Sequence, residues 1–97
     1  MFVKGLITLS RGFEIWKNMV HANEAKMKNI GMQMVFAGTA ATDDSQLTVI
    51  MHFDSPGALE QFKGDAELTE ERVKAGVVMD TAVMTPMTEL SFTNFPS

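Results

Sequence analysis

The chain has no cysteine and no tyrosine, and only three of its 97 residues are proline. Without cysteine it can form no disulfide, no thiolate nucleophile and no thiolate metal site. No apolar run approaches the roughly 18 to 20 residues that a membrane helix needs, so we expect no membrane partner. The first ten residues, MFVKGLITLS, contain no signal-type hydrophobic region, so we expect a cytoplasmic protein.

Positive charge is also scarce, because eight basic residues face twelve acidic ones and give a net charge of −4. A protein that follows a phosphate backbone needs a basic face, so this balance argues against a nucleic-acid partner. The composition is 45% hydrophobic and 21% charged, which is typical of a soluble globular chain. A chain of this length can bury only one core, so we expect a single domain over residues 1–97.

The hydrophobic pattern predicts six elements in the order strand, helix, strand, strand, helix, strand. The strands are expected at residues 2–9, 32–37, 46–54 and from 77 or 79 to about 92, and the helices at 11–30 and 56–75. Ser10 is expected to cap the first helix, and Asp54 or Ser55 the second. For Asp54 we favour this cap role over a role in orienting His52. Gly64 should interrupt the second helix and Asp65 should cap its continuation.

This order predicts an α+β, ferredoxin-like βαββαβ fold, with a four-stranded antiparallel sheet and the helices on one face. In the strand at 46–54, one alternating face is wholly apolar and should pack on the helices. The opposite face still carries apolar positions such as Ile50, and an exposed apolar sheet face usually marks an interface. We therefore expect a homodimer whose sheets pack face to face, with the last strand pairing with the partner's edge.

The element order and the strand-to-helix segment FDSPGALEQF at 53–62 resemble those of the dimeric α+β barrel superfamily. That superfamily includes antibiotic-biosynthesis-monooxygenase-like domains and small families of unknown function. The resemblance spans roughly residues 2–92 and implies a dimeric barrel. It also allows a cofactor-independent oxygenase, in which the substrate itself supplies the electrons, so no cofactor is expected.

The candidate site residues lie on the sheet. His52 shares its face with Ile50 and Asp54, the face turned away from the helices toward the expected barrel interior. There His52 could act as an acid or base, with Asp54 orienting it, or it could simply form a hydrogen bond at an interface or sheet end. Met34 and Phe36 could join this site, because the hairpin loop does not fix which layer they face.

Other residues favour structural roles. His21 falls on the polar stripe of the first helix, and no histidine or carboxylate spacing supplies a metal site, so we expect no metal. Arg72 falls among charged residues that form a solvated face of the second helix, which should bury Leu68 and Val73. The nine methionines and Trp16 are expected in core packing, although flexible thioethers could also line an adaptable apolar pocket, and Trp16 could stack on a ligand.

Three functions fit these observations. The first is a small dimeric barrel protein that binds an apolar or amphipathic small molecule between two sheets. The second is a cofactor-independent monooxygenase-like enzyme. The third is an oligomerisation module whose sheet face serves only for assembly. We favour the first, with the enzyme as the alternative. The sequence contains no dinucleotide-binding, P-loop, zinc-protease or nucleophile-elbow motif, which argues against other chemistries.

Overall fold

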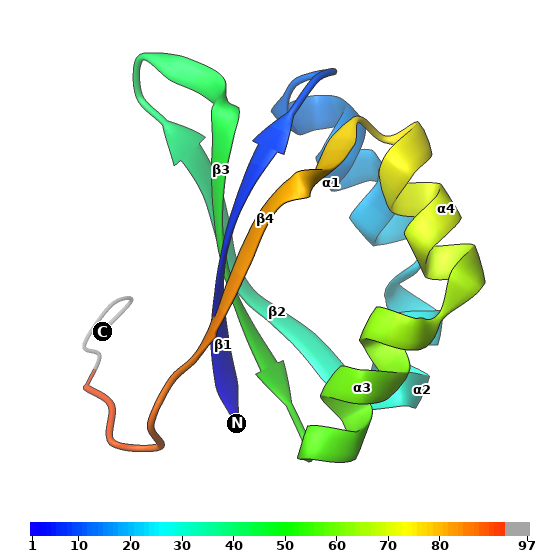
Figure 1. Ribbon diagram of the computed structural model, residues 1–97, viewed down its shortest axis with the longest axis vertical. Helices are drawn as coiled ribbons and strands as arrows, with labels where there is room; N and C mark the ends of the chain where they lie inside the picture. The colour runs from blue at the N-terminus through cyan, green and yellow to red at the C-terminus, as the bar shows by residue number, and fades with distance from the viewer. Residues whose placement is uncertain (93–97) are drawn as a thin grey trace.

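The computed structural model describes residues 1–92 and shows a curved sheet with its helices packed against one face (Figure 1). The chain runs through eight elements: β1 (Phe2–Leu9), α1 (Phe13–Ala22), α2 (Glu24–Ile30), β2 (Met32–Ala40), β3 (Asp43–Phe53), α3 (Pro56–Gly64), α4 (Ala66–Lys74) and β4 (Val77–Pro86). The strands lie in the order β2-β3-β1-β4, and each neighbouring pair is antiparallel. This arrangement confirms the predicted ferredoxin-like fold.

The core lies between the sheet and the helix layer. Leu47, Val49, Met51 and Phe53 alternate along β3, and each is at most 2% exposed. The intervening side chains of β3 point to the opposite, uncovered face, as expected for a strand with a period of two. Burial of the alternating apolar face therefore fixes which side of the sheet the helices cover.

The helix expected at 11–30 is divided into α1 and α2 at Asn23, which is a correction to the sequence prediction. The Asn23 side chain donates a 2.8 Å hydrogen bond from Nδ2 to the Met19 carbonyl oxygen. Such a local bond competes with helix continuation, since it satisfies a carbonyl that the next turn would otherwise use. The helix ends at Gly31, whose φ of 95° is readily adopted only by glycine.

The helix caps differ from two of the expectations. Ser10 does not cap α1, because its hydroxyl donates to the Gly76 carbonyl oxygen at 3.2 Å and Gly12 holds the N-cap position. Ser55, not Asp54, caps α3, since its Oγ accepts a 3.1 Å bond from the Ala58 N–H.

The broken second helix was predicted correctly. It is interrupted after Gly64, and Asp65 caps α4 by accepting the Leu68 N–H at 2.9 Å. Within α4, Leu68 is fully buried, but Val73 is 53% exposed, so the expectation that both are buried is wrong for Val73. Positions 68, 72 and 75 follow helical spacing along the inner face, which turns Val73 outward.

The strands at the hairpin are longer than predicted, and the last strand is shorter. β2 and β3 extend to a two-residue turn at 41–42, whereas a connection over 38–45 was expected. β4 ends at Pro86 rather than near Phe92, because its partner β1 begins at Phe2, whose carbonyl oxygen accepts the Met87 N–H at 2.8 Å. Residues 93–97, expected to form a short tail, lie outside the described residues.

Candidate ligand-binding cavity

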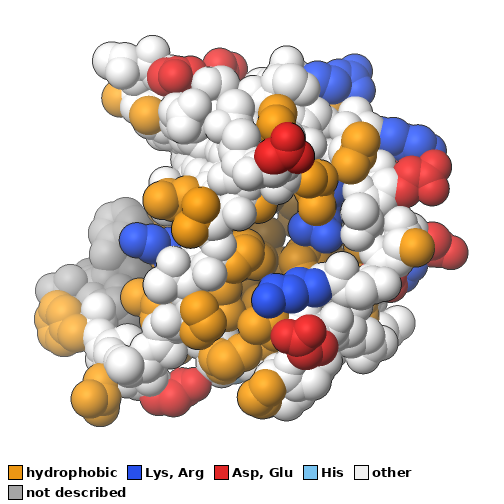
Figure 2. Space-filling view, in the orientation of Figure 1, with side chains coloured by type: hydrophobic (Ala, Val, Ile, Leu, Met, Phe, Trp, Pro, Cys, Tyr) orange, Lys and Arg blue, Asp and Glu red, His pale blue; other side chains and the backbone are white. Residues whose placement is uncertain are grey.

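A cavity of about 180 Å³ lies between the sheet and the helix layer. In the space-filling view it is a hollow lined by hydrophobic side chains, with Lys and Arg side chains beside it (Figure 2). Its walls come from every layer of the fold, since α1, α2, α3 and α4 and all four strands contribute side chains. The cavity therefore exists only once the helices have closed over the sheet.

Methionine dominates the lining. Seven of the nine methionines of the chain border the cavity: Met19, Met27, Met32, Met34, Met51, Met79 and Met84. Thioether side chains are unbranched and polarisable, so they adapt to ligands of different shape and contact aromatic rings favourably. Four of them, Met19, Met27, Met32 and Met51, are also buried in the hydrophobic core, which confirms the expected role in core packing.

The volume limits what can enter. An apolar cavity of roughly 150 Å³ accommodates a molecule of about the size of benzene. The observed volume of about 180 Å³ therefore suits one aromatic ring or a short branched chain. Trp16, which is 4% exposed and is the only tryptophan of the chain, borders the same space. Its indole is a built-in reporter of occupancy.

One guanidinium borders the largely apolar cavity, and Lys63 is the other charged residue of the lining. The side chain of Arg72 on α4 lies over the Phe62 ring, with Cζ 4.7 Å from the ring centroid. Burial lowers the pKa of Arg72, whereas the negative charge of Asp65 raises it. Because an arginine guanidinium keeps its proton throughout the physiological pH range, the group remains a cation. The sequence expectation that Arg72 belongs to a solvated face is therefore wrong.

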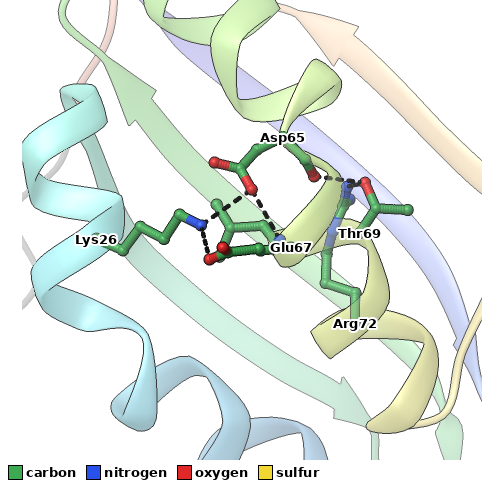
Figure 3. Close-up of polar contacts among 6 residues, drawn as sticks. Lys26, Asp65, Glu67, Thr69 and Arg72 are labelled. Carbon is green, nitrogen blue, oxygen red and sulfur yellow. Dashed lines mark hydrogen bonds and ion pairs between the residues drawn. The ribbon is translucent and has the colours of Figure 1, made fainter.

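A polar network at the junction of α3 and α4 holds this arginine in place (Figure 3). Lys26 of α2 forms ion pairs with Asp65 at 3.1 Å and Glu67 at 2.6 Å. The Thr69 hydroxyl donates to the Asp65 carbonyl oxygen at 2.9 Å and accepts from Arg72 Nη2 at 3.3 Å. The network thus ties the α2 helix to the turn of α4 that carries the guanidinium.

The ion pairs and hydrogen bonds of this network shift the pKa values of Lys26 and Asp65. Hydrogen bonds with Glu67 and Asp65 raise the pKa of Lys26 despite some desolvation. The pKa of Asp65 is lowered, first because its carboxylate accepts the Leu68 N–H and then because of Lys26. Both groups are therefore charged at neutral pH, and the Asp65 carboxylate is already occupied by Lys26.

The candidate residues identified from sequence divide between the two faces of the sheet. Met34 faces the helices, because it pairs with Met51 and borders the cavity. After a register shift at Val35, Phe36 pairs with Ile50 on the uncovered face. That uncovered face also carries His52, which does not border the cavity.

His52 lies at one end of the sheet. Its Nε2 accepts from the Met1 ammonium at 3.1 Å, and its ring packs edge-on against Phe2 with 4.9 Å between centroids. Within residues 1–92, the Asp54 carboxylate makes no hydrogen bond to His52. Instead, the Asp54 N–H donates to the Gly31 carbonyl oxygen at 2.9 Å, which holds Asp54 at the strand end.

The sequence did not identify Arg72 as a site residue. The one available indication was its spacing four residues after Leu68, the strongest apolar position of α4, because residues at i and i+4 share a helix face. That indication is weak, since the stem of a surface arginine commonly covers an apolar face while its head stays in water.

Neither a metal cluster nor a membrane span is evident in the part of the chain that the structure describes. No group of three or more His, Asp or Glu residues within 1–92 could hold a metal ion. No helix in the same range is long and apolar enough to cross a membrane.

Comparison with known proteins adds the fold but not an activity. No family model and no curated protein matches the sequence. Two solved structures, each described as a "putative antibiotic biosynthesis monooxygenase", are each 14% identical to the chain and have TM-scores of 0.59 and 0.58. The one from Deinococcus radiodurans covers 96% of this chain and 98% of its own, and the one from Nitrosomonas europaea covers 90% and 98%.

A third similar structure, a structural-genomics target from Agrobacterium tumefaciens, is 13% identical and has a TM-score of 0.63. The match covers 97% of this chain and 98% of that one. Near-complete coverage at such low identity establishes a common architecture, while function must be argued from the site. The chain therefore has the same ferredoxin-like α+β fold as these three structures, in agreement with the resemblance in the sequence.

Proposed function

We propose that the protein binds a small, largely apolar organic molecule in the methionine-lined cavity. The observation that carries this proposal is the enclosure of about 180 Å³ by seven methionines and Trp16, with a single guanidinium beside Phe62. Ligand sites are typically concave and apolar with a few polar groups that fix orientation. The proposal keeps the expected ligand class but moves the ligand from the space between two sheets to the space between sheet and helices.

Catalysis is the second candidate, because two structures of the same fold are each described as a "putative antibiotic biosynthesis monooxygenase". The candidate acid or base from the sequence, His52, lies outside the cavity on the opposite face of the sheet. The titratable side chains that border the cavity are Lys63 and Arg72, which are cations. This lining favours binding of a ligand over general acid–base chemistry on it.

The indole of Trp16 provides the test of ligand binding. Titration with the neutral probe 3-phenylpropan-1-ol, which contains one ring, should change Trp16 fluorescence along a saturable curve. Excitation at about 295 nm selects tryptophan and avoids the phenyl group of the probe. An emission that stays constant or drifts linearly up to the solubility limit would refute ligand binding in this cavity. Native mass spectrometry of freshly purified protein would report any retained natural ligand.

The proposal also includes a homodimer formed through the uncovered sheet face. Leu6, Phe36 and Val83 are 43%, 58% and 56% exposed there, and strand pairing places Leu6 beside Val83 and Phe36 beside Ile50. Beyond β4, Leu90 and Phe92 are also almost fully exposed. A two-fold dimer needs one self-complementary patch, and this apolar face meets that need.

Sedimentation velocity at micromolar concentration tests the assembly. A dimer should sediment with about twice the 10.7 kDa mass of one chain. A species of single-chain mass alone would refute the homodimer while leaving the cavity proposal intact. The third function, an assembly module with no ligand, predicts a dimer together with an unresponsive Trp16.

A further inference from the structure

We propose that the ligand of the cavity is a small aromatic or aliphatic carboxylate, and that Arg72 binds its carboxylate group. This inference rests on the proposed function and adds the chemical class of the ligand. The apolar part of such a molecule would lie among the methionines, and its negative charge would meet the guanidinium beside Phe62.

The first argument is the incomplete hydrogen bonding of Arg72. Its Nη2 donates to Thr69 at 3.3 Å, but the buried Nε has no hydrogen-bond partner, and it is the only such buried side-chain atom within residues 1–92. A buried donor without an acceptor costs free energy. Because Arg72 borders the cavity, its incompletely bonded guanidinium favours a ligand that carries an acceptor.

The second argument is charge. None of the ion pairs within residues 1–92 includes Arg72. The carboxylate best placed to neutralise it, that of Asp65, is held instead by Lys26 at 3.1 Å and by the Leu68 N–H at 2.9 Å. The Lys26 pairs therefore leave a positive charge facing the cavity.

The third argument is pre-organisation. The Arg72 Cζ atom lies over the Phe62 ring, 4.7 Å from its centroid, and Nη2 donates to the Thr69 hydroxyl. Cation–π contact and an existing hydrogen bond restrict the side chain before any ligand arrives. A planar guanidinium also matches the two oxygens of a carboxylate better than a point charge does.

Lys63 is the other cation beside the cavity, and it is less suited to this role. Its side chain is 50% exposed and lies 3.9 Å from the Glu60 carboxylate on the same helix. Its ammonium can therefore remain in water with a partial counter-charge. Arg72 is more buried, lacks a carboxylate partner and is held by an aromatic ring, so we assign the anion contact to Arg72.

The test compares three probes that share a phenyl ring and a short chain. The carboxylate 3-phenylpropanoate, the neutral 3-phenylpropan-1-ol and the cation 3-phenylpropan-1-amine are titrated against the wild-type protein at pH 7, with Trp16 fluorescence as the readout. A hydrogen-bonded ion pair with Arg72 should make the carboxylate bind at least about tenfold tighter than the alcohol. The amine should bind more weakly than either.

Variants then identify the responsible side chain. In Arg72→Gln the ratio of carboxylate to alcohol affinity should fall below about threefold, and in Arg72→Lys it should be intermediate. Lys74→Gln on the same helix, whose ammonium pairs with Glu70 at 3.3 Å, removes one positive charge away from the cavity and should leave the ratio unchanged. Each ratio is measured within one variant, so moderate changes in stability do not distort it.

The outcomes separate this inference from the proposed function. If no probe changes Trp16 fluorescence, binding in the cavity itself is refuted. If the alcohol binds and the carboxylate binds no tighter in the wild type, the carboxylate assignment is wrong although the cavity stands. If the preference survives Arg72→Gln and disappears in Lys63→Gln, the anion is held by Lys63 instead. If Arg72→Gln does not fold, Arg72→Lys and Lys63→Gln still assign the preference to one of the two cations.

Discussion

Gly5 and Val49 face each other directly across β1 and β3, and a Cβ atom on Gly5 would lie 2.7 Å from Val49 Cγ2. The same atom would lie 3.2 Å from Met84 Sδ, because Gly5 also pairs with Met84 on the other side of β1. Val49 and Met84 both border the cavity. Because Gly5 has no side chain, Val49 on β3 and Met84 on β4 can pack beside it and form part of the cavity wall.

Gly5→Ala should lower the free energy of unfolding by about 1–3 kcal/mol, because the new methyl group overpacks the sheet beneath the helices. Urea unfolding followed by circular dichroism measures the change. The control is Gly64→Ala at the end of α3, where an added Cβ meets no atom within 4 Å. That variant should be unchanged or up to about 1 kcal/mol more stable. Equal effects of the two substitutions would contradict the close contact at Gly5.

Ala82→Phe should close the cavity from the β4 side. Ala82 borders the cavity on the edge strand and is only half-buried, so a larger side chain can enter without disrupting the central sheet. The affinity for 3-phenylpropan-1-ol should fall at least about tenfold, measured by Trp16 fluorescence. Ala40→Phe places the same side chain at an exposed position at the end of β2 and is the control. A retained affinity in Ala82→Phe would place the ligand elsewhere.

The ferredoxin-like fold could be predicted from the sequence because alternation of apolar residues identifies a strand and its buried face, as in β3. Leu47, Val49, Met51 and Phe53 alternate with polar or weakly apolar neighbours, and this period specifies both a strand and its buried face. The βαββαβ order of these elements then predicted the ferredoxin-like fold. Asp65 was also predictable, because an acidic cap directly after glycine restarts a helix by a local hydrogen bond.

The cavity could not be predicted in the same way, because its walls are distant in sequence. Met19 and Met84 border the same space only after α1 packs over the sheet and β4 pairs with β1. The role of Arg72 depends on Phe62 in the preceding helix and on Lys26 forming pairs with Asp65 and Glu67. The spacing of residues along one helix contains no information on these long-range contacts. For this reason the sequence predicted that Arg72 lies on the solvent-exposed face of its helix.

Phe36→Glu should weaken the proposed dimer strongly. Phe36 is 58% exposed on the uncovered sheet face, where it lies on the edge strand β2, and a glutamate buried there by a partner would lose hydration. Sedimentation velocity should show the mass shifting from two chains to one at micromolar concentration. Val73→Glu is the matched control, because Val73 is 53% exposed on the helix layer. A monomer in Val73→Glu and a dimer in Phe36→Glu would place the interface on the helices.

Asp65→Asn should reduce the loss of stability at acidic pH. The folded-state pKa of Asp65 lies below its ordinary value of 3.8, so its contribution to stability is fully present above about pH 4 and is lost as pH falls through the folded pKa. Asparagine keeps the N-cap hydrogen bond but cannot titrate. Unfolding midpoints between about pH 5 and 2 should therefore fall less steeply in the variant.

Some acid sensitivity should remain in Asp65→Asn. The pKa of Asp43 is also lowered, by hydrogen bonds from the Ser45 hydroxyl at 2.6 Å and the Ser45 N–H at 3.0 Å. Asp43→Asn combined with Asp65→Asn should flatten the profile further. Superimposable profiles for the wild type and Asp65→Asn would show that the carboxylate is not linked to folding through its charge.

His52→Ala should leave the Trp16 titration unchanged, since the His52 side chain lies on the uncovered face while the cavity lies on the other side of the sheet. Met84→Ala is the matched comparison, because Met84 borders the cavity and is only partly buried. Removing its thioether should alter the affinity for 3-phenylpropan-1-ol measurably, for instance by a factor of about three or more. The two variants therefore test opposite faces of one sheet with one probe. If His52→Ala abolished the response and Met84→Ala preserved it, the ligand would lie on the uncovered face, in the space between two sheets that the sequence first suggested.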